Sequence, residues 1–205
     1  MENHENTWDL FLKIKTAGRD DQNSDEYRYP YEPTPYSVLE RLADSGLLHK
    51  NNTVLDYGCG KGRAGFFLSF KTKAKTIGIE YDDRIYQSAL ENQKNARVAA
   101  DFILTRAEDY TVPETVDRCY FFNPFSVEIL HKVMARIMDS YYENPREMFL
   151  FFYYPSDDYL AYLMTVDELD FYDEIECDDL FDGTDARERI MIFQLPCSET
   201  KINGG

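Results

Sequence analysis

A short apolar run that ends in an acid and a glycine-rich turn constrains this chain more than any other feature. Residues 53–62 read Thr-Val-Leu-Asp-Tyr-Gly-Cys-Gly-Lys-Gly, with Asp56 after the apolar run and Gly58, Gly60 and Gly62 at every second position. Glycines let a backbone turn tightly and approach a ligand without intervening side chains. Residues 63–68 continue as an apolar helical pattern whose amino end faces the same crevice. We therefore expect a strand, a cofactor-binding turn and a helix.

The glycines alone leave the cofactor open. Residues 60–65 also match the G-x-G-x-x-G pattern of dinucleotide-binding proteins, so an NAD-dependent oxidoreductase is one candidate. Asp56 favours another, because a carboxylate before the turn repels a pyrophosphate and attracts an ammonium group such as that of S-adenosylmethionine. Glu80 ends a second predicted strand, 75–81, about 20 residues further on, where it would accept hydrogen bonds from both ribose hydroxyls of either cofactor.

Strand and helix patterns alternate along most of the chain. Further strands are predicted near 101–105, 119–122 and 148–154, and the last two runs are apolar enough to be buried on both faces. Thr34 with Pro35, Asp82 or Asp83, and Ser126 are helix-start signals. The final strands, 171–177 and 189–195, are separated by an acidic turn instead of a helix, which fits an antiparallel hairpin. The pattern predicts an α/β fold with a doubly wound seven-stranded sheet and an antiparallel C-terminal hairpin.

This ordered set of motifs resembles the class I S-adenosylmethionine-dependent methyltransferases, over about residues 30–195. The resemblance implies a Rossmann-like methyltransferase fold, S-adenosylmethionine as cofactor, and methyl transfer as the reaction. Residues 80–82 (Glu-Tyr-Asp) stand at the family's ribose position and residues 105–109 (Thr-Arg-Ala-Glu-Asp) at its adenine position. Arg106 stands where many members carry Asp, so Glu108 or a backbone group would contact the adenine.

The expected cofactor-binding residues combine the turn with these family positions. Thr34 is included because residues 32–35 (Glu-Pro-Thr-Pro) resemble a segment of some lysine methyltransferases. A role as helix cap would also explain a threonine at this position. Cys59 has an alternative reading as a small residue packed under the turn. The set is Thr34, Asp56, Gly58, Cys59, Gly60, Gly62, Glu80, Tyr81, Ala107, Glu108 and Asn123.

Asn123, Pro124 and Phe125 are the expected catalytic residues. They end the fourth strand beside the turn, at the crevice where open α/β sheets bind ligands. The Asn123 carboxamide and neighbouring carbonyls would accept hydrogen bonds from an amine while Phe125 packs over it. In the resembling families Asn-Pro-Pro-aromatic marks transfer to amino nitrogens, which favours a small-molecule or protein amine over an oxygen acceptor. The alternative is a structural turn before a helix that Ser126 caps.

The net charge of the chain limits the kinds of partner that it can bind. The formal net charge is −16 and Lys and Arg form no cluster, so we expect no nucleic-acid partner. The acidic segment 157–188 is expected to be a solvated face, with a docking surface for a basic partner or cationic substrate as the alternative. Tyrosines at 27, 29, 31, 36, 153 and 154 would line a substrate pocket or pack in the core.

Other sequence signals indicate where the protein is located and whether it binds a metal. No run reaches the roughly 20 apolar residues of a membrane span and no signal segment opens the chain, so we expect a cytoplasmic protein without a membrane partner. Its four cysteines and three histidines suggest neither a metal site nor a disulfide framework.

The expected organisation is one domain with short additions. Residues 1–30 form an N-terminal helical cap or lid, with a helix packed on the core edge as the alternative. Residues 31–197 form the class I methyltransferase domain, and 198–205 a polar tail. A module that binds S-adenosylmethionine without catalysis remains an alternative function.

Overall fold

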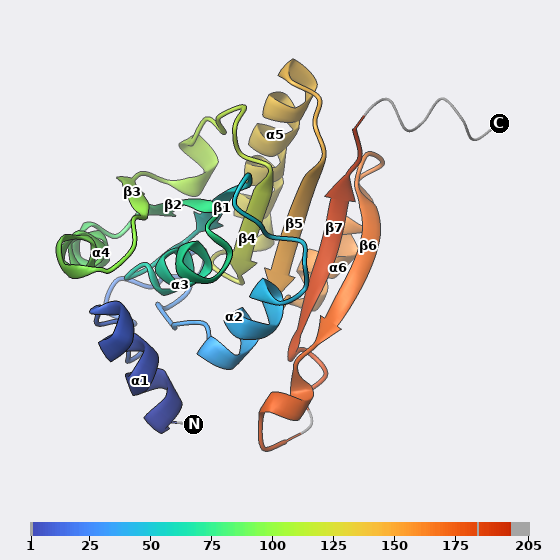
Figure 1. Cartoon of the computed structure of the whole chain (residues 1–205). Coiled ribbons are helices and arrows are strands. Elements are labelled where there is room, and N and C mark those ends of the chain that lie inside the picture. Colours follow the sequence, from blue (N-terminus) through green and yellow to red (C-terminus); the bar gives the residue numbers. More distant parts are fainter. Residues whose placement is uncertain (1, 184, 198–205) are drawn as a thin grey trace.

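The computed structural model describes residues 2–183 and 185–197, and side chains from residue 5 onward, so the predicted tail 198–205 lies outside the described residues. At its centre is a seven-stranded sheet of order β3-β2-β1-β4-β5-β7-β6 (Figure 1). The strands are β1 (Thr53–Tyr57), β2 (Lys75–Glu80), β3 (Asp101–Leu104), β4 (Arg118–Phe122), β5 (Met148–Tyr153), β6 (Asp170–Glu176) and β7 (Arg189–Leu195). Strands β1 to β5 pair in parallel, and β7 pairs antiparallel with both β5 and β6. The predicted seven-stranded sheet with its antiparallel hairpin is confirmed.

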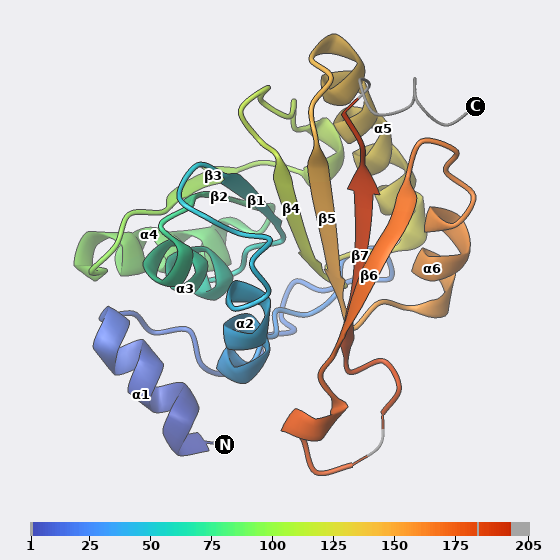
Figure 2. The same ribbon diagram turned by 45° about the vertical axis from the view of Figure 1, so that its right-hand side comes forward.

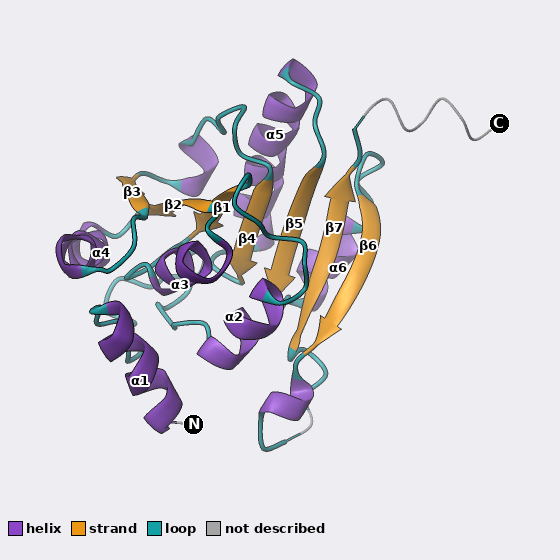
Figure 3. Cartoon of the chain, viewed as in Figure 1, coloured by secondary structure: helices purple, strands orange, loops and turns teal. Residues whose placement is uncertain are grey.

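Helices cover both faces of this sheet (Figure 3). They are α1 (Glu2–Leu12), α2 (Tyr36–Ala43), α3 (Arg63–Thr72), α4 (Asp83–Asn95), α5 (Val127–Glu143) and α6 (Asp157–Leu163), with short 3₁₀ turns at Ala107–Asp109 and Asp178–Leu180. Helices α1 to α4 pack on one face and α5 and α6 on the other (Figures 1 and 2). Successive strand residues face opposite layers, so Phe151 joins the first cluster and Phe152 the second. Both faces of β4 and β5 are therefore buried, which explains their continuous apolar runs.

Two local expectations need correction. Thr34 does not cap α2: the N-cap residue is Pro35, and the Thr34 hydroxyl instead lies 3.0 Å from the Tyr120 hydroxyl on β4. The threonine side chain turns toward the sheet, where a buried phenol needs a partner. Ser126 occupies the N-cap position of α5 without a side-chain cap bond, whereas Asp82 caps α4 through the Arg84 and Ile85 amides as predicted.

Helix α1 is anchored by a buried polar network. The Asp9 carboxylate accepts hydrogen bonds from the Thr16 amide at 2.7 Å, the Thr16 hydroxyl at 2.7 Å and the Tyr36 hydroxyl at 2.6 Å. The Trp8 ring packs edge-on against Phe67, with 4.9 Å between ring centroids. These contacts join α1 to α2 and α3, so the helix is packed on the edge of the core.

A loop between α1 and α2 crosses the carboxyl ends of the parallel strands (Figure 2). We call residues 17–33 the crossing segment. Asp20 and Tyr31 form a β-bridge within it, and Arg28 forms another with Phe125. The Tyr29 amide donates to the Pro124 carbonyl at 3.2 Å. These bonds hold the segment over the end of the sheet where α/β proteins bind ligands.

Among the helices of residues 2–183 and 185–197, none combines the length and the apolar character that a membrane span requires.

Asp9→Ala should lower the free energy of unfolding by about 2–4 kcal/mol, because it leaves buried donors without an acceptor. Urea denaturation would measure the loss. Asp21→Ala, at an exposed position on the crossing segment, is the matched control and should change stability by less than about 0.5 kcal/mol. Equal stability of the two variants would show that the network does not anchor α1.

Candidate functional site

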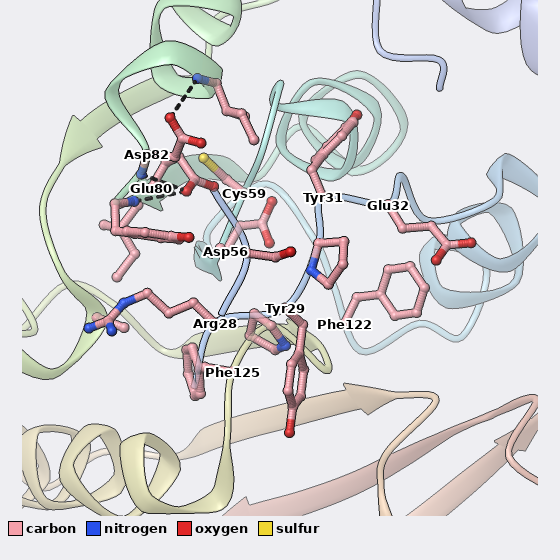
Figure 4. Close-up of a pocket in the computed structure, with 18 of the residues that line it drawn as sticks. Arg28, Tyr29, Tyr31, Glu32, Asp56, Cys59, Glu80, Asp82, Phe122 and Phe125 are labelled. Carbon is pink, nitrogen blue, oxygen red and sulfur yellow. Dashed lines mark hydrogen bonds between the residues drawn. The ribbon is translucent and has the colours of Figure 1, made fainter. Parts of the chain in front are cut away.

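A pocket lies at the carboxyl ends of β1, β2 and β4, beneath the crossing segment (Figure 4). It has a volume of about 930 Å³ when the space open to solvent is included. The predicted site residues that line it are Thr34, Asp56, Gly58, Cys59, Glu80, Tyr81, Ala107, Glu108, Pro124 and Phe125. The fold thus brings together motifs that are spread over 92 positions of sequence, from residue 34 to residue 125.

The glycine turn is tied to the end of the neighbouring strand. The Gly58 and Cys59 amides both donate to the Ile79 carbonyl at 3.0 Å, and the Gly60 amide donates to Glu80 Oε2 at 2.9 Å. Gly60 has φ +56°, and a Cβ there would lie 2.2 Å from the Tyr31 ring. Glycine is needed at this position both for the left-handed backbone and for the close approach of the crossing segment.

Glu80 is buried and held by backbone donors. Its Oε1 accepts from the amides of Tyr81 at 2.9 Å and Asp82 at 3.0 Å, in addition to the Gly60 bond at Oε2. Burial raises the pKa of this carboxyl, and the backbone hydrogen bonds oppose the rise. A carboxylate offers roughly four acceptor positions, so about one remains for a ligand after these bonds. Glu80 therefore both fixes the turn and presents an acceptor to the pocket.

Asp56 is a buried acid that lacks a polar partner. It lies at the end of β1 with 4% of its surface exposed, and among the described residues no hydrogen bond or ion pair reaches its carboxylate. Figure 4 shows it among the residues around the centre of the pocket. Burial, and then repulsion from Glu80, raise the pKa of Asp56 to about 7. A carboxylate in this position would be stabilised by a cationic ligand group.

The predicted adenine position lies under the crossing segment. Glu108, in the 3₁₀ turn Ala107–Asp109, forms an ion pair with Arg28 at 2.5 Å, and its Oε2 is buried without a hydrogen-bond partner. The Arg28 guanidinium also lies 5.1 Å from the centroid of the Tyr81 ring. Two predicted adenosine-binding residues are thus connected by one arginine of the crossing segment.

Three predicted residues do not line this pocket. The Tyr31 ring covers Gly60, while Gly62 is the N-cap of α3. Asn123 lines a neighbouring pocket instead, with a left-handed φ of +40° and a buried Oδ1 that has no hydrogen-bond partner. Pro124 and Phe125 face the first pocket, so this segment separates the two cavities.

The position of Cys59 agrees with the alternative reading of a small residue packed under the turn. It is buried under the turn, where a Cβ added to Gly78 would lie 2.6 Å from its Sγ. Burial raises the pKa of its thiol well above the ordinary value, so the reactive thiolate is disfavoured. Within the part of the chain that the structure describes, no group of three or more His, Cys, Asp or Glu side chains is placed to hold a metal ion.

Sequence comparison identifies the central part of the chain. Residues 48–144 match a family profile described as "Methyltransferase domain". A protein-lysine N-methyltransferase of Saccharolobus islandicus is 36% identical over 69 residues, which cover 32% of this chain and 42% of that protein. A ribosomal protein L11 methyltransferase of Methylobacillus flagellatus is 33% identical over 72 residues, which cover 35% of this chain and 24% of that protein. The chain therefore spans less than half the length of these curated relatives.

Solved structures share the fold over most of the chain at low sequence identity. An RNA methyltransferase from Salinibacter ruber in complex with S-adenosyl-L-homocysteine has a TM-score of 0.54 at 16% identity, covering 80% of this chain and 94% of that one. A TehB-like S-adenosylmethionine-dependent methyltransferase from Corynebacterium glutamicum has a TM-score of 0.55 at 17% identity, covering 95% and 97%. The predicted resemblance is confirmed: residues 48–144 match a methyltransferase-domain profile, and the chain shares the Rossmann-like fold of solved S-adenosylmethionine-dependent methyltransferases.

Asp56→Asn should stabilise the ligand-free protein more at pH 8 than at pH 5. The pKa of about 7 lies above the ordinary 3.8, so the wild-type protein takes up a proton on folding and loses stability as the pH rises from about 4 to 7. An asparagine side chain does not titrate, so the variant does not lose stability over this pH range. Its gain in free energy of unfolding over the wild-type protein should therefore be about 2 kcal/mol larger at pH 8 than at pH 5. Denaturation at both pH values would measure the difference. Asp167→Asn, at an exposed position, should show no pH-dependent gain; the same gain in both variants would refute this environment for Asp56.

Proposed function

We propose that this chain is an S-adenosylmethionine-dependent methyltransferase that transfers a methyl group to an amine nitrogen. The buried Asp56 carboxylate is the observation that carries the proposal, since it lacks a partner beside the glycine turn. S-adenosylmethionine has an ammonium group that would pair with it, whereas the pyrophosphate of NAD would be repelled. The methyltransferase-domain match and the shared fold favour the same cofactor.

The pocket residues fit the parts of this cofactor. Asp56 would hold the ammonium group, Glu80 the ribose, and the segment Ala107–Asp109 would lie along the adenine. When bound, the cofactor supplies a methyl group on a positively charged sulfur. The chain's own residues have to exclude water and hold an acceptor in line with that bond, which accounts for much of the rate in a direct displacement.

The segment Asn123–Phe125 would orient the methyl acceptor. Pro124 and Phe125 contact the first pocket and Asn123 the second, so a nitrogen placed between them would face the cofactor. The unpaired Asn123 Oδ1 would accept a hydrogen bond from this nitrogen. A protein-lysine methyltransferase among the relatives is consistent with an amine acceptor.

A nucleic-acid acceptor has less support. The Salinibacter ruber relative is an RNA methyltransferase, but at 16% identity the likeness concerns the fold. The net charge of −16 opposes approach of a polyanion. A retained fold without activity is the remaining alternative, and methyl transfer to any acceptor would exclude it.

Isothermal titration with S-adenosylmethionine, S-adenosylhomocysteine and NAD tests the cofactor. We expect the first two to bind and NAD not to bind. Glu80→Ala should weaken S-adenosylhomocysteine binding by about 1.5–3 kcal/mol, because it removes acceptor bonds from the ribose and from the Gly60 amide. Glu91→Ala, at an exposed position on α4, is the control. A change below twofold in the Glu80 variant would reject the ribose assignment, and tight NAD binding would reject the proposed function.

We also propose that the crossing segment acts as the lid predicted within residues 1–30. Beside a few backbone bonds and the Arg28–Glu108 pair, it is joined to the domain by polar contacts nearer the surface, including the Asp20–Arg84 ion pair at 2.5 Å and the Tyr81 hydroxyl bond to the Asn23 carbonyl at 2.6 Å. Exposed contacts of this kind are individually weak, so the segment can open without unfolding the sheet. Cofactor would enter in the open state and be covered in the closed one.

Hydrogen exchange tests this lid. With S-adenosylhomocysteine at 100 times its Kd, exchange of the Tyr31 amide, which donates to the Asp20 carbonyl, should slow by up to about 100-fold, because the open state is disfavoured. The Asn144 amide at the end of α5 opens far from the pocket and should be unaffected. Equal protection at both amides, or none at Tyr31, would contradict a moving lid.

A further inference from the structure

A second cavity adjoins the cofactor pocket and shares one wall with it. The shared residues are Tyr29, Pro30, Glu32, Pro33 and Phe122. Its other side is formed by the ends of β4 and β5 and by the loop that leads into β7, including Asn123, Tyr153 and Glu188. A ligand in the second cavity would therefore lie next to a ligand in the first.

Aromatic rings form the inner wall of this second cavity. The Phe122 ring centroid lies 4.7 Å from that of Tyr153 and 6.5 Å from that of Tyr154. Flat apolar surfaces of this kind cover alkyl stems, and their faces attract cations. The wall is suited to a ligand with an apolar stem and a positive end.

Two carboxylates, Glu32 and Glu188, supply negative charge at the same cavity. The Tyr153 hydroxyl donates to Glu188 Oε2 at 2.6 Å and fixes its direction. Burial raises the pKa of Glu188, with repulsion from Asp185 and Glu32 among the further causes. Glu32 already has a cation 3.6 Å away, the Arg19 guanidinium, but both side chains are more than half exposed and the pair is correspondingly weak. An incoming cation can replace it.

The backbone is strained where the two strands end. Asn123 after β4 has φ +40° and Tyr154 after β5 has φ +52°, and both line the second cavity. Left-handed backbone is unfavourable for a bulky side chain such as tyrosine, and strain of this kind persists where surrounding contacts impose it. Here the two left-handed residues, Asn123 and Tyr154, place a polar and an aromatic side chain at the same cavity.

We propose that the second cavity is the acceptor site and binds an alkylammonium group, with its stem along Phe122 and Tyr153 and its charge between Glu32 and Glu188. This inference rests on the proposed methyl transfer and names the class of substrate for it. The negative charge of the whole chain favours the approach of such a cation.

The bound ammonium loses one proton to water at the open side of the cavity, which leaves a lone pair on nitrogen. That pair forms the bond to the methyl carbon of S-adenosylmethionine as the carbon–sulfur bond breaks and its electron pair stays on sulfur. The products are S-adenosylhomocysteine and the methylated ammonium. Asn123 lines the second cavity next to Pro124 of the cofactor pocket, and it would orient the nitrogen during this step.

Nuclear magnetic resonance titration of the full chain tests the site. The probes are n-butylammonium, N-acetyl-lysine methylamide and hexanoate, each added with and without S-adenosylhomocysteine. We expect one or both ammonium probes to bind and to shift the Tyr154 and Asn123 signals, and hexanoate not to bind. Binding of the lysine probe alone would point to a protein side chain, and binding of both to an alkylamine in general. Equal binding of hexanoate would overturn the proposal.

Charge-neutral variants locate the cation. Glu188→Gln and Glu32→Gln should each weaken ammonium binding by about tenfold, since each removes one charge-assisted contact. Glu143→Gln at the far end of α5 makes the same charge change and should have no effect. Arg19→Ala should leave ammonium binding equal or tighter. Equal affinity in Glu188→Gln, Glu32→Gln and Glu143→Gln would overturn the site, whichever probe binds.

The same titrations separate this proposal from the proposed function. S-adenosylhomocysteine should bind Glu188→Gln, Glu143→Gln and Arg19→Ala as it binds the wild-type chain; Glu32→Gln is left out of this comparison because Glu32 also lines the cofactor pocket. If it binds none of them while ammonium probes bind as expected, the cofactor assignment fails and the cavity stands. If it binds and the ammonium probes do not, the cofactor assignment stands and the acceptor site fails.

Discussion

Two buried carboxylates at the ends of adjacent strands set the conditions for the rest of this structure. Asp56 lies near the carboxyl end of β1 and Glu80 ends β2, and these strands pair directly in the sheet. Backbone donors from the turn and from the start of α4 compensate the buried charge of Glu80, whereas the carboxylate of Asp56 has no such donors. The turn therefore depends on one acid for its shape, and it leaves the other acid to a ligand. Because burying an unpaired charge is costly, this arrangement is best explained by binding.

The crossing segment completes a pocket that the sheet alone leaves open. Tyr31 packs on Gly60, and Arg28 reaches Glu108, 80 positions further along the chain. Its backbone bonds to the segment after β4 are few, and apart from Tyr31 and the largely buried Arg28–Glu108 pair its anchors include ion pairs and hydroxyl bonds nearer the surface. The amino-terminal part thus combines a firmly packed helix, α1, with a loop held mainly by polar contacts. This division agrees with a rigid domain that has one movable cover.

The sequence predicted the sheet well because its signals are local. Apolar runs such as β4 and β5 are long enough to identify buried parallel strands, and the acids at the carboxyl ends of β1 and β2 stand next to recognisable turns. The crossing segment had no such signal, since its contacts join polar residues far apart in sequence. Thr34 could be read from the sequence as a helix cap or as a cofactor contact; its contact with Tyr120 and the N-cap at Pro35 exclude the cap, and the cofactor contact stays a prediction. Helix α6 was missed inside the acidic segment because Tyr159 and Leu163 are its only buried residues.

Glu188 shows why composition could not locate the second cavity. It belongs to an acidic segment whose average character is that of a solvated face, yet it lies beside Tyr153 because β7 runs antiparallel to β5 and begins where β5 ends. That register places one carboxylate of the segment at the carboxyl end of the sheet. The same strand end holds Tyr154 in a left-handed conformation, and the neighbouring strand end does the same with Asn123. These two left-handed residues line one cavity beside the proposed cofactor pocket, and an in-line transfer between two ligands would require two such neighbouring sites.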